Sequence, residues 1–470
     1  MKIIAEGKPI QNWGGSIRSF PKIVVQAETV EDIVDIVRDP KRFPSPVRAV
    51  GSNHSTTRCG VADQGTVVAM TQMNQILEID PDEMTVTAQA GALYIDVAHQ
   101  LLEHNLQFYV NVELGNLTLG SAACGGTKDA SMPGEYGQVC SYAVGIKLVT
   151  DSGGRMEVTE EKDPELMRAM RSSYGLFGIL YEVTFKVKQL RPLSVHHITY
   201  SLRDFETQLP ALIGEGQSMM LYLFPFLDKV SVEYRRYGDA VGRPNRLLWR
   251  FRNQTWKNIG PGYGYLVTKL VPIKSIRYRL IDRFNQVLQF IVKSLLRDRN
   301  TVPSDQIIRY PEKSNWLRYT FSIWAFPEEE YPIILREYFA FCRNYYRENG
   351  YRCNLLNVAY RISEDKSSLF SYSFNGNVLT LDPVSTGDRG WEDFLIAYNE
   401  FCSERGGVPL FNQTRGITPS QAKKAFGDRL NGFREYRERL DASNRFLNDY
   451  FRQVIDVGLA VKSVPEGEQS

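Results

Sequence analysis

Val50-Gly51-Ser52-Asn53-His54-Ser55 is the stretch around which the chain is organised. The residues that lead into it, Val47 to Val50, predict a strand. This strand runs into a turn of small residues, where consecutive backbone N–H groups can converge on one anion. We therefore expect a phosphate-binding loop, with the imidazole of His54 inside it.

A second stretch of small residues follows further along the chain. It runs Leu117-Thr118-Leu119-Gly120-Ser121-Ala122-Ala123-Cys124-Gly125-Gly126-Thr127. Small side chains let a flat or extended ligand approach the backbone closely. The first loop is not a dinucleotide fingerprint, because no amphipathic helix follows His54, and it lacks the Gly-Lys-Ser/Thr of a Walker loop. Together the two stretches predict a site for a nucleotide-like cofactor.

Length and composition indicate a soluble globular protein. With 470 residues, 43% of them hydrophobic, the chain is long enough for two or three domains. No window is apolar enough to span a membrane, and the N-terminus lacks the apolar core of a signal peptide. The six cysteines show no C-x-x-C spacing, which favours reduced thiols and argues against a structural metal. We expect a cytoplasmic protein without bound metal.

The net charge of +2 hides a local excess of basic residues. Residues 241–300 hold thirteen Lys or Arg and two acids, so this segment carries +11 and the remainder about −9. Within it, apolar residues from Ile276 to Leu295 recur at helical spacing with basic flanks. The pattern fits either a surface helix packed on its own domain or a basic amphipathic helix, residues 274–299, peripheral to a membrane. Nucleic-acid binding is not expected, because no stacking surface is interleaved with the basic residues.

The order of the predicted elements indicates an α+β fold. Thr29 is expected to cap a helix whose apolar residues recur at i, i+3, i+4 and i+7. Alternating or apolar runs predict strands, with helices between several of them. These strands are expected at 67–70, 76–79, 85–90, 142–150, 156–158, 179–187, 220–224 and 317–326.

The two small-residue stretches resemble the vanillyl-alcohol-oxidase/p-cresol-methylhydroxylase flavoproteins, and most closely their aldonolactone and alditol oxidase branch. Further motifs recur in the same order: Gly175 to Gly178, and Phe446-Leu447-Asn448-Asp449-Tyr450 near the C-terminus. The resemblance implies two α/β subdomains that bind FAD and an inserted cap domain with an antiparallel sheet and helices. It places the FAD-binding domain at 1–190, the cap or substrate domain at 191–388, and a C-terminal segment at 389–470 that packs back on the FAD domain.

The resemblance also implies which residues hold the cofactor. His54 stands where those enzymes bond the C8 methyl of the flavin covalently; the alternative is a loop histidine that only hydrogen-bonds the pyrophosphate. The residues expected to contact FAD lie in the two loops and near Gly178. They are Gly51, Ser52, Asn53, His54, Ser55, Thr118, Ser121, Ala123, Cys124, Gly125, Gly126, Thr127, Ala130, Ser131, Gly178 and Ile179.

Alcohol oxidation needs a group that accepts the hydroxyl proton and a donor or cation that stabilises the reduced flavin. Where the family branch has a lysine for the second task, this chain has Gln413, so Arg415 or Lys128 is expected to supply the charge. The branch also has a glutamate on a cap strand that this chain lacks. Tyr360, Arg361 and Tyr372 are the candidates for the base, and packing or surface roles are the alternative.

The resemblance implies an FAD-dependent oxidoreductase that oxidises a CH–OH group of a sugar, polyol, aldonolactone or related alcohol by hydride transfer to flavin N5. Dioxygen or another acceptor would reoxidise the flavin. One alternative is a dehydrogenase on a phosphorylated or lipid-linked sugar that uses an acceptor other than oxygen. The other is a flavin-binding protein without catalysis, since the family lysine and glutamate are missing.

Overall fold

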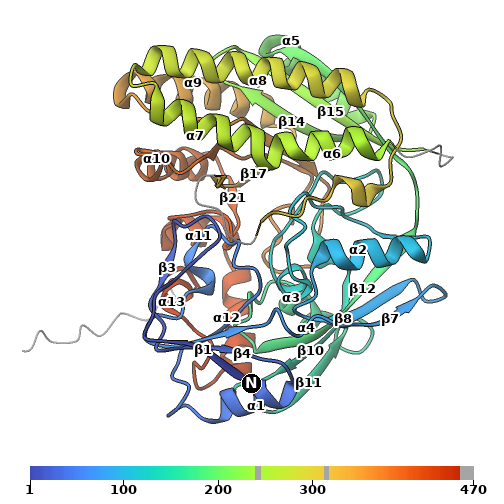
Figure 1. The fold of residues 1–470 in the computed structure, drawn as a ribbon, viewed down its shortest axis with the longest axis vertical. Helices are drawn as coiled ribbons and strands as arrows, with labels where there is room; N and C mark the ends of the chain where they lie inside the picture. The colour runs from blue at the N-terminus through green and yellow to red at the C-terminus, as the bar shows by residue number, and fades with distance from the viewer. Residues whose placement is uncertain (239–244, 312–316, 456–470) are drawn as a thin grey trace, which may run out of the picture.

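The computed structural model describes residues 1–238, 245–311 and 317–455. Two sheets with short helices form one half of the molecule, and a larger sheet covered by long helices forms the other (Figure 1). The chain begins in the first half, builds most of the second, and returns to the first in its last helices. The expected α+β class is confirmed.

A four-stranded sheet carries the first loop. Its strand order is β1-β4-β6-β5, with β4, β5 and β6 parallel and β1 antiparallel at the edge. Thr29 caps α1 through a capping box with Asp32, as the sequence predicts. The elements are β1 (Lys2–Glu6), β4 (Ile23–Gln26), α1 (Val30–Arg38), β5 (Val47–Val50) and β6 (Thr66–Ala69), with the small hairpin β2 (Ile10–Gln11) and β3 (Arg18–Ser19) beside them.

An antiparallel sheet follows, with order β11-β10-β12-β8-β7 and β9 paired to β12. The predicted strands of this region are confirmed. The second small-residue stretch contains a short helix, α3 (Leu119–Cys124), whose alanines and leucine are buried. The other elements are η1 (Arg58–Gly60), β7 (Ile76–Asp80), β8 (Thr85–Gln89), α2 (Tyr94–Glu103), β9 (Leu106–Phe108), η2 (Val139–Tyr142), β10 (Ala143–Val149), β11 (Arg155–Thr159), α4 (Pro164–Met170) and β12 (Ile179–Gln189).

A seven-stranded antiparallel sheet, here called the cap sheet, has the order β13-β15-β14-β18-β19-β17-β21. On β14, Met219, Leu221 and Leu223 pack in the core with α5 and α9, while the alternate residues face the other side. The strands are β13 (Leu193–Ser201), β14 (Ser218–Phe224), β15 (Lys229–Tyr237), β17 (Trp324–Pro327), β18 (Asn357–Ile362), β19 (Val378–Leu381) and β21 (Val408–Pro409), and the two helices are α5 (Leu202–Gly214) and α9 (Tyr331–Asn349).

Helices α6 (Arg246–Gln254), α7 (Gly260–Leu270) and α8 (Lys274–Leu296) adjoin the cap sheet (Figure 1). A π-helical turn, η3 (Thr255–Ile259), joins α6 to α7, and η4 (Pro303–Gln306) follows α8. The predicted helix at 276–295 is therefore confirmed as α8. None of the helices in the described residues is long and apolar enough to cross a membrane.

The single long strand predicted at 317–326 is wrong. The chain forms two short strands there, β16 (Thr320–Phe321) and β17, which pair with β20 (Val384–Ser385) and β19 respectively. Between them the backbone N–H of Ser322 donates to the carbonyl of Pro383, outside either ladder. Alternation in the sequence could not reveal this change of partner, because it is set by segments distant in the chain.

The C-terminal elements connect both halves. They are α10 (Trp391–Glu404), α11 (Pro419–Phe426), α12 (Arg429–Leu440) and α13 (Asp449–Ile455). Arg445 donates to the carbonyls of Ile36 and Val37 at the end of α1, and Asn448 donates to three carbonyls around η1.

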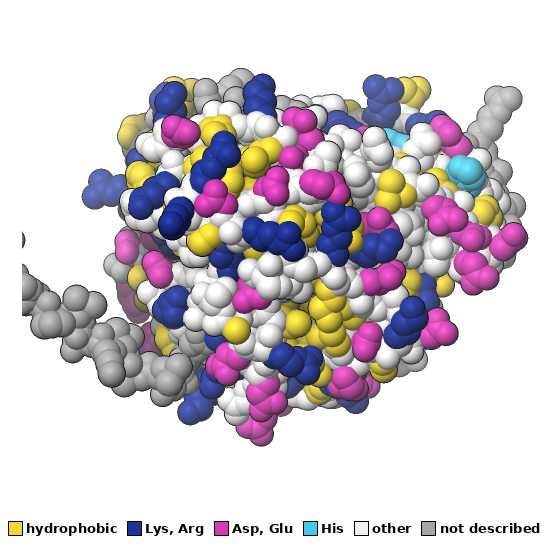
Figure 2. Space-filling view, turned by 90° about the horizontal axis from the view of Figure 1, so that it is seen from below, with side chains coloured by type: hydrophobic (Ala, Val, Ile, Leu, Met, Phe, Trp, Pro, Cys, Tyr) yellow, Lys and Arg dark blue, Asp and Glu magenta, His cyan; other side chains and the backbone are white. Residues whose placement is uncertain are grey.

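The end of the molecule that carries α1 and β1 shows interspersed basic and acidic side chains, with hydrophobic ones in small groups (Figure 2).

Candidate active site

The loop after β5 borders a cavity of about 1060 Å³, counted to its open mouth. We call it the loop cavity. Its walls come from the segments 48–55, 114–127 and 174–180, together with Asn412 and Gln413. The sheet edge, α3 and the C-terminal segment therefore meet around one space, although they are far apart in sequence.

The backbone of the first loop is held by its neighbours. Asn53 has a left-handed conformation, with φ of 55°, and its carbonyl accepts the N–H of Trp13 at 2.8 Å. A Cβ at Gly51 would lie 2.3 Å from the hydroxyl oxygen of Thr118, so only glycine fits between the two small-residue stretches. The two stretches predicted to act together are thus in direct contact.

His54 borders the loop cavity as a neutral imidazole. Its ring stacks on Trp13, with centroids 4.8 Å apart and an interplanar angle of 20°. Burial lowers its pKa to about 4, because an imidazolium would lose its hydration there. A neutral ring keeps a lone pair on one nitrogen, which either a hydrogen bond from a ligand or a bond to carbon requires.

Gly178 borders the other end of the cavity under a similar constraint. Its φ is 153°, and a Cβ there would lie 2.5 Å from the carbonyl oxygen of Val149. The backbone just before β12 therefore lies close to the end of β10, and a larger residue than glycine would not fit at this part of the cavity wall. Gly120 plays the same part on α3, where a Cβ would lie 2.9 Å from the Cβ of Ala90.

The loop cavity suits FAD by size, by its backbone and by its unpaired polar atoms. Small residues and glycines present main chain to a long, flat ligand, and the turn at 51–55 offers N–H groups to phosphates. The side-chain oxygens of Asn412 and Gln413 are buried without hydrogen-bond partners in the described residues. Buried polar atoms of this kind are normally satisfied, so a ligand with donors is expected beside them.

A second cavity, of about 1130 Å³ to its mouth, lies under the cap sheet, and we call it the cap cavity. Its lining is largely apolar and aromatic, including Tyr222, Trp256 and Tyr310. Leu114, Thr127 and Gln413 border both cavities. A ligand in the cap cavity would therefore lie next to one in the loop cavity.

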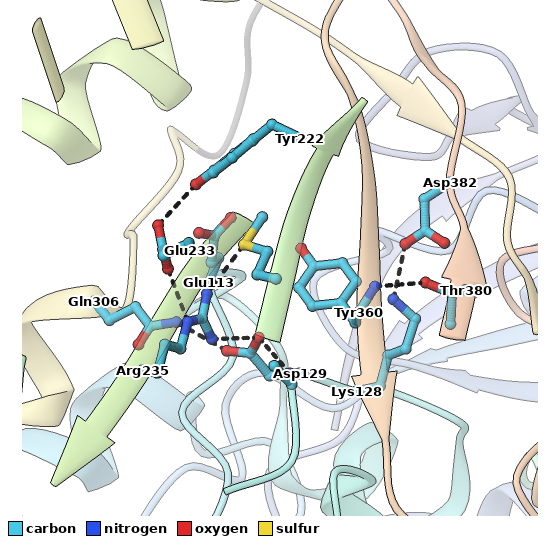
Figure 3. A network of polar contacts seen from close by, with 12 residues as sticks. Glu113, Lys128, Asp129, Tyr222, Glu233, Arg235, Gln306, Tyr360, Thr380 and Asp382 are labelled. Atoms are coloured by element: carbon cyan, nitrogen blue, oxygen red, sulfur yellow. Dashed lines mark hydrogen bonds and ion pairs between the residues drawn. The ribbon is translucent and has the colours of Figure 1, made fainter. Parts of the chain in front are cut away.

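Lys128 and Asp382 form a buried ion pair on the wall of the cap cavity (Figure 3). The Nζ of Lys128 lies 2.8 Å from one carboxylate oxygen and 3.8 Å from the ring centre of Tyr360. The other oxygen of Asp382 is buried without a hydrogen-bond partner in the described residues. Burial raises the pKa of Asp382, and the charge of Lys128 opposes that rise.

A network of buried charged and polar side chains lies beside this ion pair (Figure 3). Arg235 contacts Asp129 at 2.6 Å and Glu233 at 2.8 Å, and Glu233 also accepts from the hydroxyl of Tyr222. Gln306 donates to the second oxygen of Asp129. Asp129 directly follows Lys128 in the loop after α3, whereas Arg235 and Glu233 lie on β15. These bonds therefore join that loop to the cap sheet.

Comparison with known proteins agrees with this geometry. The model of a family described as "FAD binding domain" matches residues 21–159. This part of the chain therefore resembles an FAD-binding domain. L-Gulonolactone oxidase of Bos taurus is 23% identical over 96% of this chain and 98% of its own length. L-Gulono-1,4-lactone dehydrogenase of Mycobacterium tuberculosis is 22% identical over 94% and 98%.

The fold is shared with a solved structure over nearly the whole chain. Cholesterol oxidase of Brevibacterium sterolicum has a TM-score of 0.75 at 14% identity, over 96% of this chain and 97% of that chain. At this identity the likeness concerns the fold. The resemblance to FAD-linked oxidoreductases that the sequence motifs indicate is confirmed by the family match and the relatives together.

Most residues predicted to contact FAD do line the loop cavity, next to the FAD-binding domain's first loop. Those in its lining are Gly51, Ser52, Asn53, His54, Ser55, Thr118, Ser121, Cys124, Gly125, Thr127 and Gly178. Ala123 and Ile179 are buried in the core instead, and Gly126 packs beside Leu410. Ala130 and Ser131 lie outside the lining, where Ser131 N–H donates to the carbonyl of Arg361.

The predicted catalytic residues divide into two groups. Gln413, Lys128 and Tyr360 meet at the cap cavity. Arg361 is instead ion-paired with Glu328, and Arg415 with Glu392, and neither is in the lining of either cavity. Tyr372 is buried in the cluster of Ile323 and Leu410.

Sequence reasoning missed several residues of the two cavities. Arg48 and Asn412 border the loop cavity, and Glu113 and Asp382 border the cap cavity. Glu113 could have been found from the sequence, because it is an acid next to a stretch of small residues. Asp382 could not, because it stands far from Lys128 in the sequence and only the fold of the cap sheet brings the two together.

Proposed function

We propose that the chain uses FAD to oxidise a CH–OH group of a sugar-derived alcohol, with aldonolactones as the first candidates. The observation that carries this proposal is the shared wall at Gln413, where the loop cavity meets the cap cavity. FAD in the loop cavity would supply the hydride acceptor. Relatives named as lactone oxidases and dehydrogenases, similar along nearly their whole length, support the same substrate class.

Asp382 is our candidate for the group that accepts the hydroxyl proton. Lys128 holds one of its oxygens, the side chain of Thr380 supplies a further hydrogen bond to the carboxylate, and Asp382 is in the lining of the cap cavity. A raised pKa makes a carboxylate a stronger base. Lys128 would orient the carboxylate and keep it ionised, while Tyr360 packs over the ammonium.

Gln413 is our candidate for the group at the reacting edge of the flavin. It borders both cavities, and its side-chain oxygen is buried without a partner in the described residues. Its amide N–H₂ can donate a hydrogen bond but carries no charge. It would therefore stabilise negative charge on the reduced cofactor less strongly than a lysine at the same place.

We propose further that His54 is the covalent attachment point of the flavin. The neutral imidazole at the cavity wall supports this, because an unprotonated nitrogen is available for a bond to carbon. Acid precipitation of the purified protein tests it. Yellow colour that stays in the pellet, and moves to the supernatant in His54→Ala, supports the bond. Colour in the supernatant for both proteins contradicts it.

Anaerobic mixing with a panel of aldonolactones, alditols and aldoses tests the reaction. The flavin absorbance is expected to bleach with at least one aldonolactone, since hydride transfer needs no oxygen. Hydrogen peroxide on readmission of air identifies an oxidase, and transfer to a dye without peroxide a dehydrogenase. No bleaching with any member of the panel would contradict the proposed substrate class and favour a flavin-binding protein without turnover.

We also propose a cytoplasmic location. All six cysteines are free, and four of them are buried. Unpaired thiols are typical of a reducing compartment. Cell fractionation with an antibody against the chain measures this directly, and recovery from an oxidising compartment would contradict it.

A further inference from the structure

Helices α6, α7 and α8 carry a concentration of exposed apolar side chains. Twenty large hydrophobic residues are exposed in the part of the chain that the structure describes, and eleven of them lie between Leu247 and Ile291. Leu247 is 76% exposed, Leu270 70% and Phe290 69%. Soluble proteins seldom gather exposed apolar surface in this way unless it binds a partner or a membrane.

The exposed residues fall on one side of each helix. On α8 they are Ile276, Leu280, Val287, Phe290 and Ile291. Their separations of three, four and seven residues place them on one stripe, opposite the buried Ile281, Leu288 and Val292. The same four-residue separation recurs on α6, at Leu247 and Phe251, and on α7, at Leu266 and Leu270. We call these stripes together the apolar face.

The charges that the helices α6, α7 and α8 themselves carry are almost all positive. Residues 245–296 contain ten Lys or Arg and one acid, Asp282, which is ion-paired with Arg352. Arg252 is buried against Glu113, so the other nine basic residues set the outer charge. The exposed ones include Arg250, Lys269, Arg279 and Arg283. By contrast, the end of the molecule in Figure 2 has basic and acidic side chains interspersed.

The inner sides of α7 and α8 border the cap cavity. Gly260 and Pro261 of α7 and Asn285 and Leu288 of α8 are in its lining. Helices α7 and α8 pack directly on each other, with Tyr263 and Phe284 stacked at 3.9 Å between ring centres. The part of the apolar face on α7 and α8 thus belongs to helices that form one wall of the proposed substrate cavity.

We propose that the apolar face of α6, α7 and α8 docks on the surface of an anionic lipid bilayer. The apolar side chains would enter the boundary between headgroups and acyl chains, and the surrounding arginines and lysines would contact lipid phosphates. Charge complementarity selects this occupant. A second copy of the chain would bring two basic faces together, which like-charge repulsion disfavours.

Vesicle flotation of the full-length holoenzyme tests the proposal. Wild-type protein is expected to float with vesicles of mixed phosphatidylcholine and phosphatidylglycerol, less with phosphatidylcholine alone, and less at high salt. The triple variant Leu280→Gln, Val287→Gln and Phe290→Gln is expected to bind at least about tenfold more weakly. The double variant Arg279→Glu and Arg283→Glu is expected to lose the preference for anionic vesicles.

Matched variants separate this surface from general surface chemistry. The control triple, Leu77→Gln, Ile333→Gln and Ile396→Gln, removes exposed apolar side chains elsewhere, and Lys41→Glu with Arg203→Glu reverses exposed charges elsewhere. Both are expected to bind vesicles like the wild type. Each variant is first checked for flavin content and melting temperature.

Three results would overturn the proposal. One is a wild-type protein that floats with neither kind of vesicle. Another is equal loss of binding in the control variants. The third is a dimer by light scattering that the triple variant on α8 abolishes while vesicle binding is unchanged, since the apolar face would then bind a second copy.

Discussion

Asp382 offers the sharpest test among single residues. Asp382→Asn keeps the side-chain shape but removes the proton acceptor, so the rate of flavin reduction by substrate is expected to fall about a hundredfold or more. Flavin content should stay the same, because Asp382 borders the cap cavity and not the loop cavity. Stopped-flow absorbance under anaerobic conditions measures the rate.

A double variant separates the chemistry of Asp382 from its ion pair. Asp382→Asn alone leaves the ammonium of Lys128 buried without its counter-ion, which costs about 3–5 kcal/mol of stability. Adding Lys128→Met should restore much of the melting temperature but none of the rate. Recovery of both would mean that the pair is structural and that the proton goes elsewhere.

The pH dependence of flavin reduction reports on the same carboxylate. Only the ionised form of Asp382 can accept a proton, so the rate should rise as pH increases through its pKa. Because burial raises that pKa, the rise is expected at higher pH than for an ordinary aspartate. A rate that is flat across the acidic range in the wild type would exclude Asp382 as the base.

Gln413 and its neighbour Asn412 form a matched pair. Gln413 borders both cavities, whereas Asn412 borders only the loop cavity. Gln413→Ala is expected to lower kcat about tenfold to a hundredfold, because it removes a donor at the junction. Asn412→Ala should change flavin retention more than kcat. Steady-state kinetics and flavin content on both proteins test this, and equal kcat losses would contradict the assignment.

Among the elements, β5 and its loop depend on Arg48. This buried guanidinium donates to four carbonyls, those of Cys59, Tyr174, Gly175 and Phe446, at 2.5 to 3.2 Å. Lysine cannot serve four acceptors in this arrangement. Arg48→Lys is therefore expected to lose about 2–3 kcal/mol of unfolding free energy and to retain FAD poorly.

Arg155→Lys is the control for this prediction. Arg155 forms an exposed ion pair with Glu31, and neither residue is in the lining of the loop cavity. Its replacement should change the unfolding free energy by no more than about 0.5 kcal/mol. Chemical denaturation compares the two variants, and similar small losses in both would show that the carbonyl cluster around Arg48 contributes little.

Elements whose signals are local could be predicted from the sequence. The capped helix α1, the strand and turn at Val47 to Ser55, and the hairpin of β10 and β11 depend on neighbouring residues, and the structure contains each of them. The division of residues 317–326 into β16 and β17 could not be predicted, because the partners of these two strands come from other parts of the chain. The helix α3 was hidden within a stretch whose small residues suit loops equally well.

At the scale of the whole molecule, the two cavities meet because the cap sheet is built from distant segments. Lys128 follows α3 in the first half, and Asp382 follows β19 in the second, so their ion pair joins the two halves. Loop motifs predicted the cofactor side of this site. The substrate side required the fold, since Asp382 stands in no recognisable motif.

The central claim is that the loop cavity holds FAD. The direct measurement is the absorption spectrum of the purified full-length protein, desalted after incubation with excess FAD. Our account predicts flavin bands at about one FAD per chain, and a clearly lower content in Gly178→Leu, whose side chain would meet Val149. A wild-type protein that shows no flavin bands after this treatment would contradict the account.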